Sequence, residues 1–232
     1  MNSLNSIVLT CEHARNRVPV NYRNLFSRNP SILNTHRAYD IGILSVAQGV
    51  SRILRRPLFA CHTTRLLIDP NRSLQHPNLY SEFSRNLPRA DRDWLYHHLY
   101  RRYRDAVIRY VKQTIRRNRC VLHLSLHSFT PVLHGRRRTT DIGILYDPTR
   151  VRERALSRTL RLHLRQFTDF KIRCNYPFRG NADGFTTALR RTFGESAYLG
   201  IEVEFNQALL TESGYRAGQI AEFLCRSLRV IS

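Results

Sequence analysis

Two histidines and two glutamates of this sequence have side chains that could carry out metal-assisted hydrolysis. His13 follows the apolar run SIVLTC, His127 lies near the end of CVLHLSLHSF, and Glu202 and Glu204 belong to IEVEFNQ. Two neutral imidazoles and a carboxylate are a common ligand set for catalytic zinc, with one position left open for water. A further carboxylate could take a proton from that water and deliver it to a leaving amine.

Either Asp40 or Glu12 could supply the carboxylate that completes the ligand set. Asp40 lies at the start of a predicted helix after the first long loop. Glu12 is the neighbour of His13, so its side chain would point to the opposite face of a regular strand. We therefore prefer Asp40. The HExxH pattern of many zinc hydrolases is absent, because Ala14, Arg15 and Asn16 follow His13.

The two glutamates of IEVEFNQ are two residues apart, which in a strand puts both side chains on one face. Ionised carboxylates are rarely buried without a partner. Either Glu202 or Glu204 could be the general base, and both could instead be salt-bridged to arginines. Three other arginines, Arg65, Arg72 and Arg138, could bind a substrate carboxylate in a bidentate way or be ordinary surface residues.

The elements that must position these side chains alternate along the chain. Strands are predicted at 6–13, 57–69, 120–129, 141–147, 170–178 and 198–206, and helices at 39–55, 90–118, 150–166, 182–192 and 212–229. This alternation favours an α/β fold with a largely parallel sheet covered on both faces. The long loops 19–34 and 69–89 have lengths that are often associated with function.

Ligands of open α/β sheets bind outside the carboxyl ends of the strands. The predicted strands carry Glu12 and His13, then Arg65, Asp69, Asn71 and Arg72, then His127 and Ser128, then Asp147, and finally Glu202 and Glu204, at or just beyond these ends. We therefore expect all these groups to meet at one edge of the sheet.

Length and composition favour one cytoplasmic domain over residues 1–232. No apolar run is long enough for a membrane span, and the N-terminus has no basic segment before its short apolar run, so we expect a first strand there and no signal peptide. The five cysteines are scattered, which suggests reduced thiols. One of them, Cys11, shares a strand face with His13, so a metal-free cysteine hydrolase is an alternative.

The formal net charge of +21 comes almost entirely from arginine, and the arginines are spread over the whole chain. Such a surface attracts polyanions non-specifically. A compositional bias of the source would explain the charge, and so would a selected anionic partner. A non-catalytic protein that binds polyanions or nucleic acid is therefore a second hypothesis for function.

Seven segments, in order along nearly the whole chain, resemble the N-formylglutamate amidohydrolase family. They are CEHARNRVP, THRAYDIG, TTRLLIDPNRS, LHSFTP, RTTDIGILYD, NYPFRGNADGFTTALRR and GIEVEFNQALL. The resemblance implies a three-layer α/β/α sandwich, similar to zinc carboxypeptidases and cell-wall amidases. It also implies one Zn2+ per chain and hydrolysis of the amide bond of an N-formyl or N-acyl amino acid, a small substrate that bears a carboxylate.

The same resemblance suggests a role for each matching residue. His13, Asp40 and His127 are the implied metal ligands, and Glu204, in the pattern Glu-x-x-Gln that ends at Gln207, is the implied general base. The implied binders of the substrate carboxylate are Asn71, Arg72 and Arg138. The residues implied to hold these groups in place are Asn16, Arg65, Ser128, Glu202 and Gln207.

Overall fold

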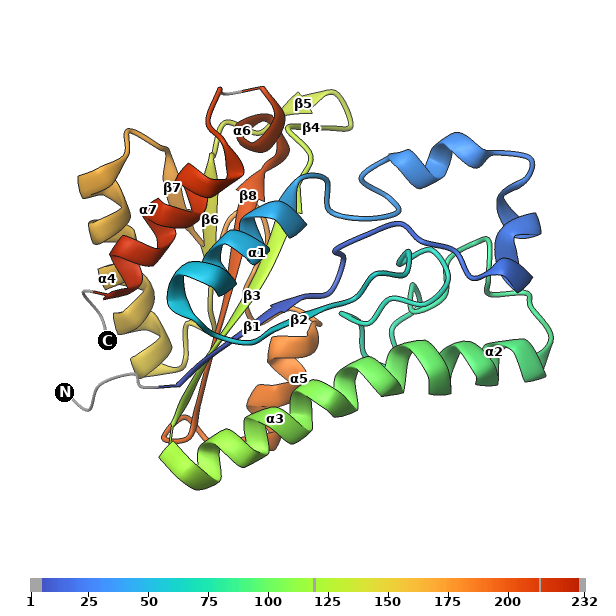
Figure 1. The fold of residues 1–232 in the computed structure, drawn as a ribbon, viewed down its shortest axis with the longest axis horizontal. Helices are drawn as coiled ribbons and strands as arrows, with labels where there is room; N and C mark the ends of the chain where they lie inside the picture. Colours follow the sequence, from blue (N-terminus) through green and yellow to red (C-terminus); the bar gives the residue numbers. More distant parts are fainter. Residues whose placement is uncertain (1–5, 119, 213, 230–232) are drawn as a thin grey trace.

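The computed structural model describes residues 6–118, 120–212 and 214–229 (Figure 1). Its strands are β1 (Ile7–Cys11), β2 (Leu58–Ala60), β3 (Val121–Phe129), β4 (Val132–Leu133), β5 (Arg136–Arg137), β6 (Ile142–Leu145), β7 (Ile172–Cys174) and β8 (Tyr198–Asn206). Six of them form the central sheet in the order β2-β1-β3-β8-β6-β7, and β4 and β5 form a separate hairpin. The predicted α/β class with a mostly parallel sheet is confirmed.

Two strands of the sheet run against the others. β6 pairs antiparallel with β8, with Leu145 opposite Glu202, and β7 is parallel to β6. The end of β6 therefore points away from the carboxyl ends of β1, β3 and β8. The expectation that Asp147 joins the other polar groups is wrong for this reason. Asp147 instead accepts hydrogen bonds from Thr149, just before the next helix begins at Val151.

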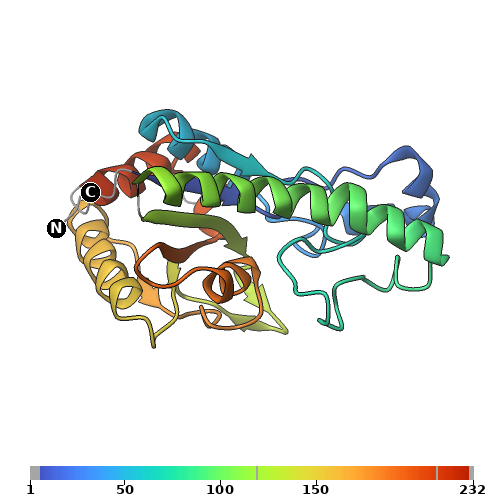
Figure 2. The same ribbon diagram turned by 90° about the horizontal axis from the view of Figure 1, so that it is seen from below.

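The helices cover both faces of the sheet. Helices α1 (Ile43–Leu54), α4 (Val151–Phe167) and α7 (Ala217–Arg229) pack on one face, and α3 (Arg102–Asn118) and α5 (Phe185–Thr192) pack on the other (Figures 1 and 2). Each lies within a predicted helix or one residue from it. Within the described residues, no helix has the length and apolar character that a membrane crossing requires.

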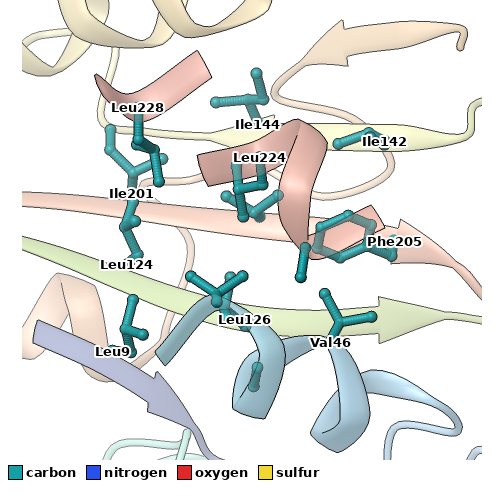
Figure 3. Close-up of a cluster of buried hydrophobic side chains, with 14 of the residues drawn as sticks. Leu9, Val46, Leu124, Leu126, Ile142, Ile144, Ile201, Phe205, Leu224 and Leu228 are labelled. Carbon is teal, nitrogen blue, oxygen red and sulfur yellow. The ribbon is translucent and has the colours of Figure 1, made fainter. Parts of the chain in front are cut away.

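The two faces of β3 and β8 differ in chemistry. Apolar residues of both strands, among them Leu124, Leu126, Ile201 and Phe205, pack under α1 and α7 (Figure 3). The alternate residues face α3 and α5, and among them are His127 and the two glutamates of β8. This alternation follows from the two-residue period of a strand. It puts a row of polar side chains inside the molecule.

The long loops build a second layer of packing beyond the sheet edge. The first contains the 3-10 helices η1 (Val20–Phe26) and η2 (Pro30–Asn34), and the second leads into α2 (Arg89–Leu95). Tyr22, Phe26, Ile32, Leu67, Leu79 and Leu95 form their shared core. In Figure 1 this region lies to the right of the sheet, away from α4 and α7. The strand predicted at 57–69 ends at Ala60, because its polar remainder leaves the sheet and joins this layer.

Candidate active site

A pocket of about 300 Å³ opens at the carboxyl ends of β1, β3 and β8. Most of the residues singled out from the sequence line it: His13, Asp40, Arg65, Asn71, Arg72, His127, Ser128, Arg138, Glu202 and Glu204. Asn16 and Gln207 do not. The topology therefore brings together residues from more than half of the chain, as the strand-end pattern predicts.

Both histidines turn the same ring nitrogen toward Asp40. His127 Nδ1 lies 2.9 Å from Asp40 Oδ2, and His13 Nδ1 lies 3.6 Å from the same oxygen. The two ring centroids are 5.1 Å apart. Ligand atoms of these three buried residues all lie within 4.8 Å of one another, which is close enough for them to share one metal ion.

The opposite ring nitrogens are held by two further buried carboxylates. His13 Nε2 lies 2.7 Å from Asp69 Oδ1, and His127 Nε2 lies 3.1 Å from Glu12 Oε2. Ser125 donates a hydrogen bond of 2.7 Å to the same Glu12 oxygen. Carboxylates in these positions favour the tautomer with the proton on Nε2, so the Nδ1 lone pairs face Asp40. Glu12 thus lies behind His127, and Asp40 lies between the histidines.

Three potential ligand atoms, the two Nδ1 atoms and Asp40 Oδ2, face one another in a buried space, an arrangement that favours a shared cation. His13 Nδ1 has no hydrogen-bond partner among the described residues, because 3.6 Å to Asp40 is too long. The carboxylates Asp40 and Glu12 also hold the pKa of His127 well above its usual range, against the effect of burial. A divalent metal would satisfy all three atoms at once. The donor set of two imidazoles and one carboxylate fits zinc.

Asp40 is itself fixed from two sides. Arg65 donates to its Oδ1, and the backbone N–H of Ser128 donates to Oδ2 over 3.1 Å. Arg65 and the two histidines hold the pKa of Asp40 well below its usual range, although burial opposes them. The carboxylate is therefore ionised and oriented, as a metal ligand must be.

Glu204 lies next to this cluster in a buried position at the pocket. Its position in β8 is opposite His127 in β3. Its Oε2 is buried and has no hydrogen-bond partner among the described residues. Burial, with Asp40 and Glu202 nearby, raises the pKa of Glu204 to about 8, although His127 acts in the other direction. A carboxyl group with a pKa near neutrality is suited to proton transfer.

Glu202 has a different environment from Glu204 although both face the pocket. It accepts a hydrogen bond from the Thr186 hydroxyl near the start of α5. Neither glutamate forms an ion pair with an arginine among the described residues. The alternative in which both are salt-bridged is therefore not what the structure has.

The three residues implied to bind a carboxylate come from two segments. Arg138 lies with its guanidinium carbon 5.7 Å from the Phe129 ring centre and 5.4 Å from that of Phe178. Arg72 Nε is 3.8 Å from Asp69 Oδ2. The Oδ1 atom of Asn71 accepts from the Phe185 backbone N–H, which ties this loop to the start of α5.

The remaining predicted residues are used for support or lie elsewhere. Gln207 donates to the Ser128 hydroxyl, which in turn donates to the carbonyl of Ile41 beside Asp40. Asn16 donates to the Leu33 carbonyl and lines a separate surface groove. Its place is in the packing of the first long loop rather than at the pocket.

Sequence reasoning gave no role to several residues of the site. Asp69, which holds His13, belongs to the segment IDPNRS, where a carboxylate just after an apolar run was the available signal. Arg179 and His36 also line the pocket. Arg179 lies in NYPFRGNADGF, and His36 lies in THRAYDIG. Nothing local in the sequence distinguishes them from the other arginines and histidines.

Cys11 does not belong to the pocket. Its side chain is fully buried in the apolar core under α1, and burial, with Asp40 and Glu12, raises its thiol pKa well above the usual range. An unreactive thiol of this kind does not support a cysteine hydrolase. All five cysteines are free.

The α/β fold and the pocket, together with the match to a family of amidohydrolases, identify the chain as a hydrolase that acts on amides. The family model for N-formylglutamate amidohydrolase matches residues 5–211, so the chain belongs to the N-formylglutamate amidohydrolase family. No functionally curated protein matches the chain closely enough to count as a relative.

Two solved structures share the fold. A gene product of Agrobacterium tumefaciens is 29% identical, with a TM-score of 0.81 over 97% of this chain and 91% of its own. The N-formylglutamate amidohydrolase of Ralstonia eutropha JMP134 is 19% identical, with a TM-score of 0.71 over 97% of this chain and 92% of its own. The second likeness concerns the fold alone.

Proposed function

We propose that this protein is a zinc-dependent amidohydrolase that cleaves the amide bond of an N-formyl or N-acyl amino acid. The observation that carries the proposal is the convergence of two histidine Nδ1 atoms on Asp40 Oδ2, with Asp69 and Glu12 behind the two rings. Family membership supports the reaction class. The assay with a panel of substrates identifies the acyl group and the amino acid.

In this proposal His13, Asp40 and His127 hold the metal. When bound, zinc would supply Lewis acidity, which polarises an amide carbonyl and makes water more acidic. The carboxylates behind the histidines keep both rings in the ligating tautomer. Arg65 keeps Asp40 ionised and in place.

Glu204 is the proposed general base and acid. Its free Oε2 atom accepts a proton from the attacking water, and the same carboxyl then donates this proton to the leaving amine nitrogen. This role is supported by the pKa of about 8 and by the buried Oε2 atom, which has no hydrogen-bond partner in the part of the chain that the structure describes. Glu202, held by Thr186, is assigned a supporting role on the same strand face.

Arg138, Arg72 and Asn71 are the proposed binders of the substrate carboxylate. The Arg138 guanidinium carbon lies 5.7 Å from the Phe129 ring centre and 5.4 Å from that of Phe178. Among the described residues, its side chain has one long hydrogen bond, of 3.5 Å, to the Thr130 carbonyl. Most of its donors are therefore free to bind a carboxylate in a bidentate way. An anchor of this kind would position the scissile amide for attack.

The deciding experiment measures metal content and activity together. Purified protein is analysed for zinc, nickel and cobalt and is then assayed with a panel of N-formyl and N-acyl amino acids, with the corresponding amino acid amides as controls that lack a carboxylate. We expect about one zinc per chain and turnover of carboxylate-bearing substrates. Protein without any of these metals that still turns over the panel would refute the proposal, and so would metal-loaded protein that cleaves none of it.

A further inference from the structure

A π-helical turn interrupts the long helix beside the active site. The segment η3 (Tyr96–Arg101) joins α2 to α3, and the three form one continuous rod in Figures 1 and 2. Leu95 and Tyr100 are both buried although they are five residues apart. In a regular α-helix such residues would point roughly 140° apart. The wider turn brings both onto the inner side, and π turns often occur at functional sites.

The turn directs two side chains onto one backbone segment. Tyr100 donates a hydrogen bond of 2.7 Å to the Arg72 carbonyl oxygen. Arg104, one α-turn later, donates to the same oxygen over 3.2 Å and to the Pro70 carbonyl over 3.0 Å. Residues four apart on a helix share a face, so the two side chains act on the segment together. We call these three hydrogen bonds the loop clamp.

Arg104 is an unusual choice for a purely structural contact. Its side chain is buried, and it forms no ion pair with a carboxylate among the described residues. Instead its guanidinium stacks on Phe185 at 4.3 Å and on Tyr100 at 4.9 Å. Burying an unpaired charge is costly. The cost is offset here by hydrogen bonds to carbonyls of a loop that carries site residues.

The clamped segment supplies groups to the proposed metal site and to the proposed site for the substrate carboxylate. Asp69 holds His13 Nε2, and its Oδ1 atom also accepts from the Asn71 backbone N–H. Asn71 is tied to the first residue of α5. Arg72 lines the pocket. A shift of this segment would therefore move a proposed substrate anchor and the carboxylate that orients a proposed metal ligand.

We propose that Tyr100 and Arg104 are positioning residues that fix the segment from Asp69 to Arg72. The expected change in KM rests on the proposed function, whereas the expected change in hydrogen exchange of the segment does not. Tyr100 acts on the Arg72 carbonyl and thus on substrate binding. Arg104 bonds the carbonyls on both sides of Asn71, so it acts on substrate binding and on the orientation of Asp69.

Three variants and one control test the loop clamp. The variants are Tyr100→Phe, Arg104→Met and Arg104→Lys. The control is Arg101→Met, because Arg101 is exposed on the same helix and pairs with Asp105 rather than with the loop. For each, the measurements are kcat, KM, the zinc dissociation constant by chelator competition, and hydrogen exchange of a peptide covering residues 69–74.

Removing one neutral hydrogen bond in Tyr100→Phe should raise KM by about 3- to 10-fold, with kcat and zinc affinity unchanged. Arg104→Met should raise both KM and the zinc dissociation constant, and Arg104→Lys should recover part of both effects. Both Tyr100→Phe and Arg104→Met should speed up hydrogen exchange in 69–74. Arg101→Met should match the wild type in every measurement.

If Tyr100→Phe and Arg104→Met lower only the melting temperature and leave hydrogen exchange, KM and zinc affinity unchanged, the clamp is structural and the inference is overturned. If no substrate is cleaved by the wild type, the proposed function fails alone. Hydrogen exchange and zinc affinity still decide the positioning role in that case, because neither depends on turnover.

Discussion

His127 and Glu204 lie directly opposite each other across the parallel strands β3 and β8, both buried and both at the pocket. The sheet register thus places a proposed metal ligand and a proposed proton carrier side by side. Because both side chains project from the central strands of the sheet, their relative position is set by backbone hydrogen bonds and not by a flexible loop. Rigid placement of this kind favours catalysis.

Glu204→Gln removes the titrating group and keeps its size. We expect a loss in kcat of roughly 100- to 10,000-fold, because general acid–base catalysis contributes about this much. Zinc content should stay at the wild-type level. The matched control is Glu202→Gln on the same strand face, in which we expect a much smaller loss. Equal losses in the two variants would contradict the assignment of Glu204.

Asp69→Asn and Glu12→Gln each weaken the hold on one histidine ring. We expect zinc affinity to fall by roughly 10- to 100-fold in each variant, as is usual when the partner of a metal-bound histidine is lost. Chelator competition measures this directly. Asp93→Asn, an exposed aspartate of α2, serves as the control. Wild-type affinity in both test variants would show that the rings need no such support.

Arg138→Ala removes the guanidinium that lies near the rings of Phe129 and Phe178. Loss of charge-assisted hydrogen bonds should raise KM by about 10- to 100-fold and change kcat less. The neighbouring Arg137, exposed on β5, gives the control Arg137→Ala. Steady-state kinetics with an N-acyl amino acid and with its amide separates the effect on binding of the substrate carboxylate from the effect on the rest of the substrate. An equal effect on both substrates would exclude a carboxylate contact.

His123 is a buried histidine that the proposed mechanism does not use. It bonds Thr10 and Tyr198, and burial is the main cause that lowers its pKa to about 4. Between pH 6.5 and 4 the unfolded chain therefore binds a proton that the folded chain does not, so stability falls as pH falls. At pH 5 this loss is about 2 kcal/mol.

The variant His123→Gln should lose less stability between pH 7 and pH 5 than the wild type, although it starts from a lower value at pH 7. Urea unfolding at the two pH values measures the difference, with His163→Gln on the outer helix α4 as the control. If wild type and His123→Gln lose the same amount, another group controls acid stability.

Cys11→Ala tests the alternative chemistry. Because the thiol is buried in the apolar core with a raised pKa, the variant should retain full amide hydrolysis. A variant that folds and binds zinc but has lost all activity would revive the cysteine hypothesis.

Most of the helices and long strands could be predicted because their apolar residues recur at helical spacing or form short continuous runs, whereas the short β4–β5 hairpin could not. The convergence of His13, His127 and Glu204 followed from topology, since parallel strands end at one edge. The direction of β6 does not follow from the apolar pattern, because the two-residue period of a strand is the same in both directions. That is why Asp147 was expected at the wrong edge. The available signal was the lack of a predicted helix between the strands at 120–129 and 141–147, since parallel strands usually need a helical crossover.

Contacts between distant residues were also beyond the sequence. The hydrogen bond from His13 to Asp69 joins residues 56 positions apart, and no local pattern encodes it. The π-helical turn adds one residue to a turn of the helix and so changes which of the following residues face inward. The apolar residues of the predicted helix lie at mostly regular spacing, so the sequence does not show this change. The single domain, the cytoplasmic location and the affinity for polyanions stay predictions.

The antiparallel direction of β6 determines which part of the pocket wall could be altered by mutation without changing the sheet. A parallel strand would need a crossover to the far edge of the sheet, whereas here the chain leaves β3 and enters β6 at the same edge. The β4–β5 hairpin fills this short path and contributes Leu133 to the pocket wall. A change in the hairpin would therefore alter one wall of the pocket and the approach to Arg138, while the six-stranded sheet that carries the histidines would keep its pairing.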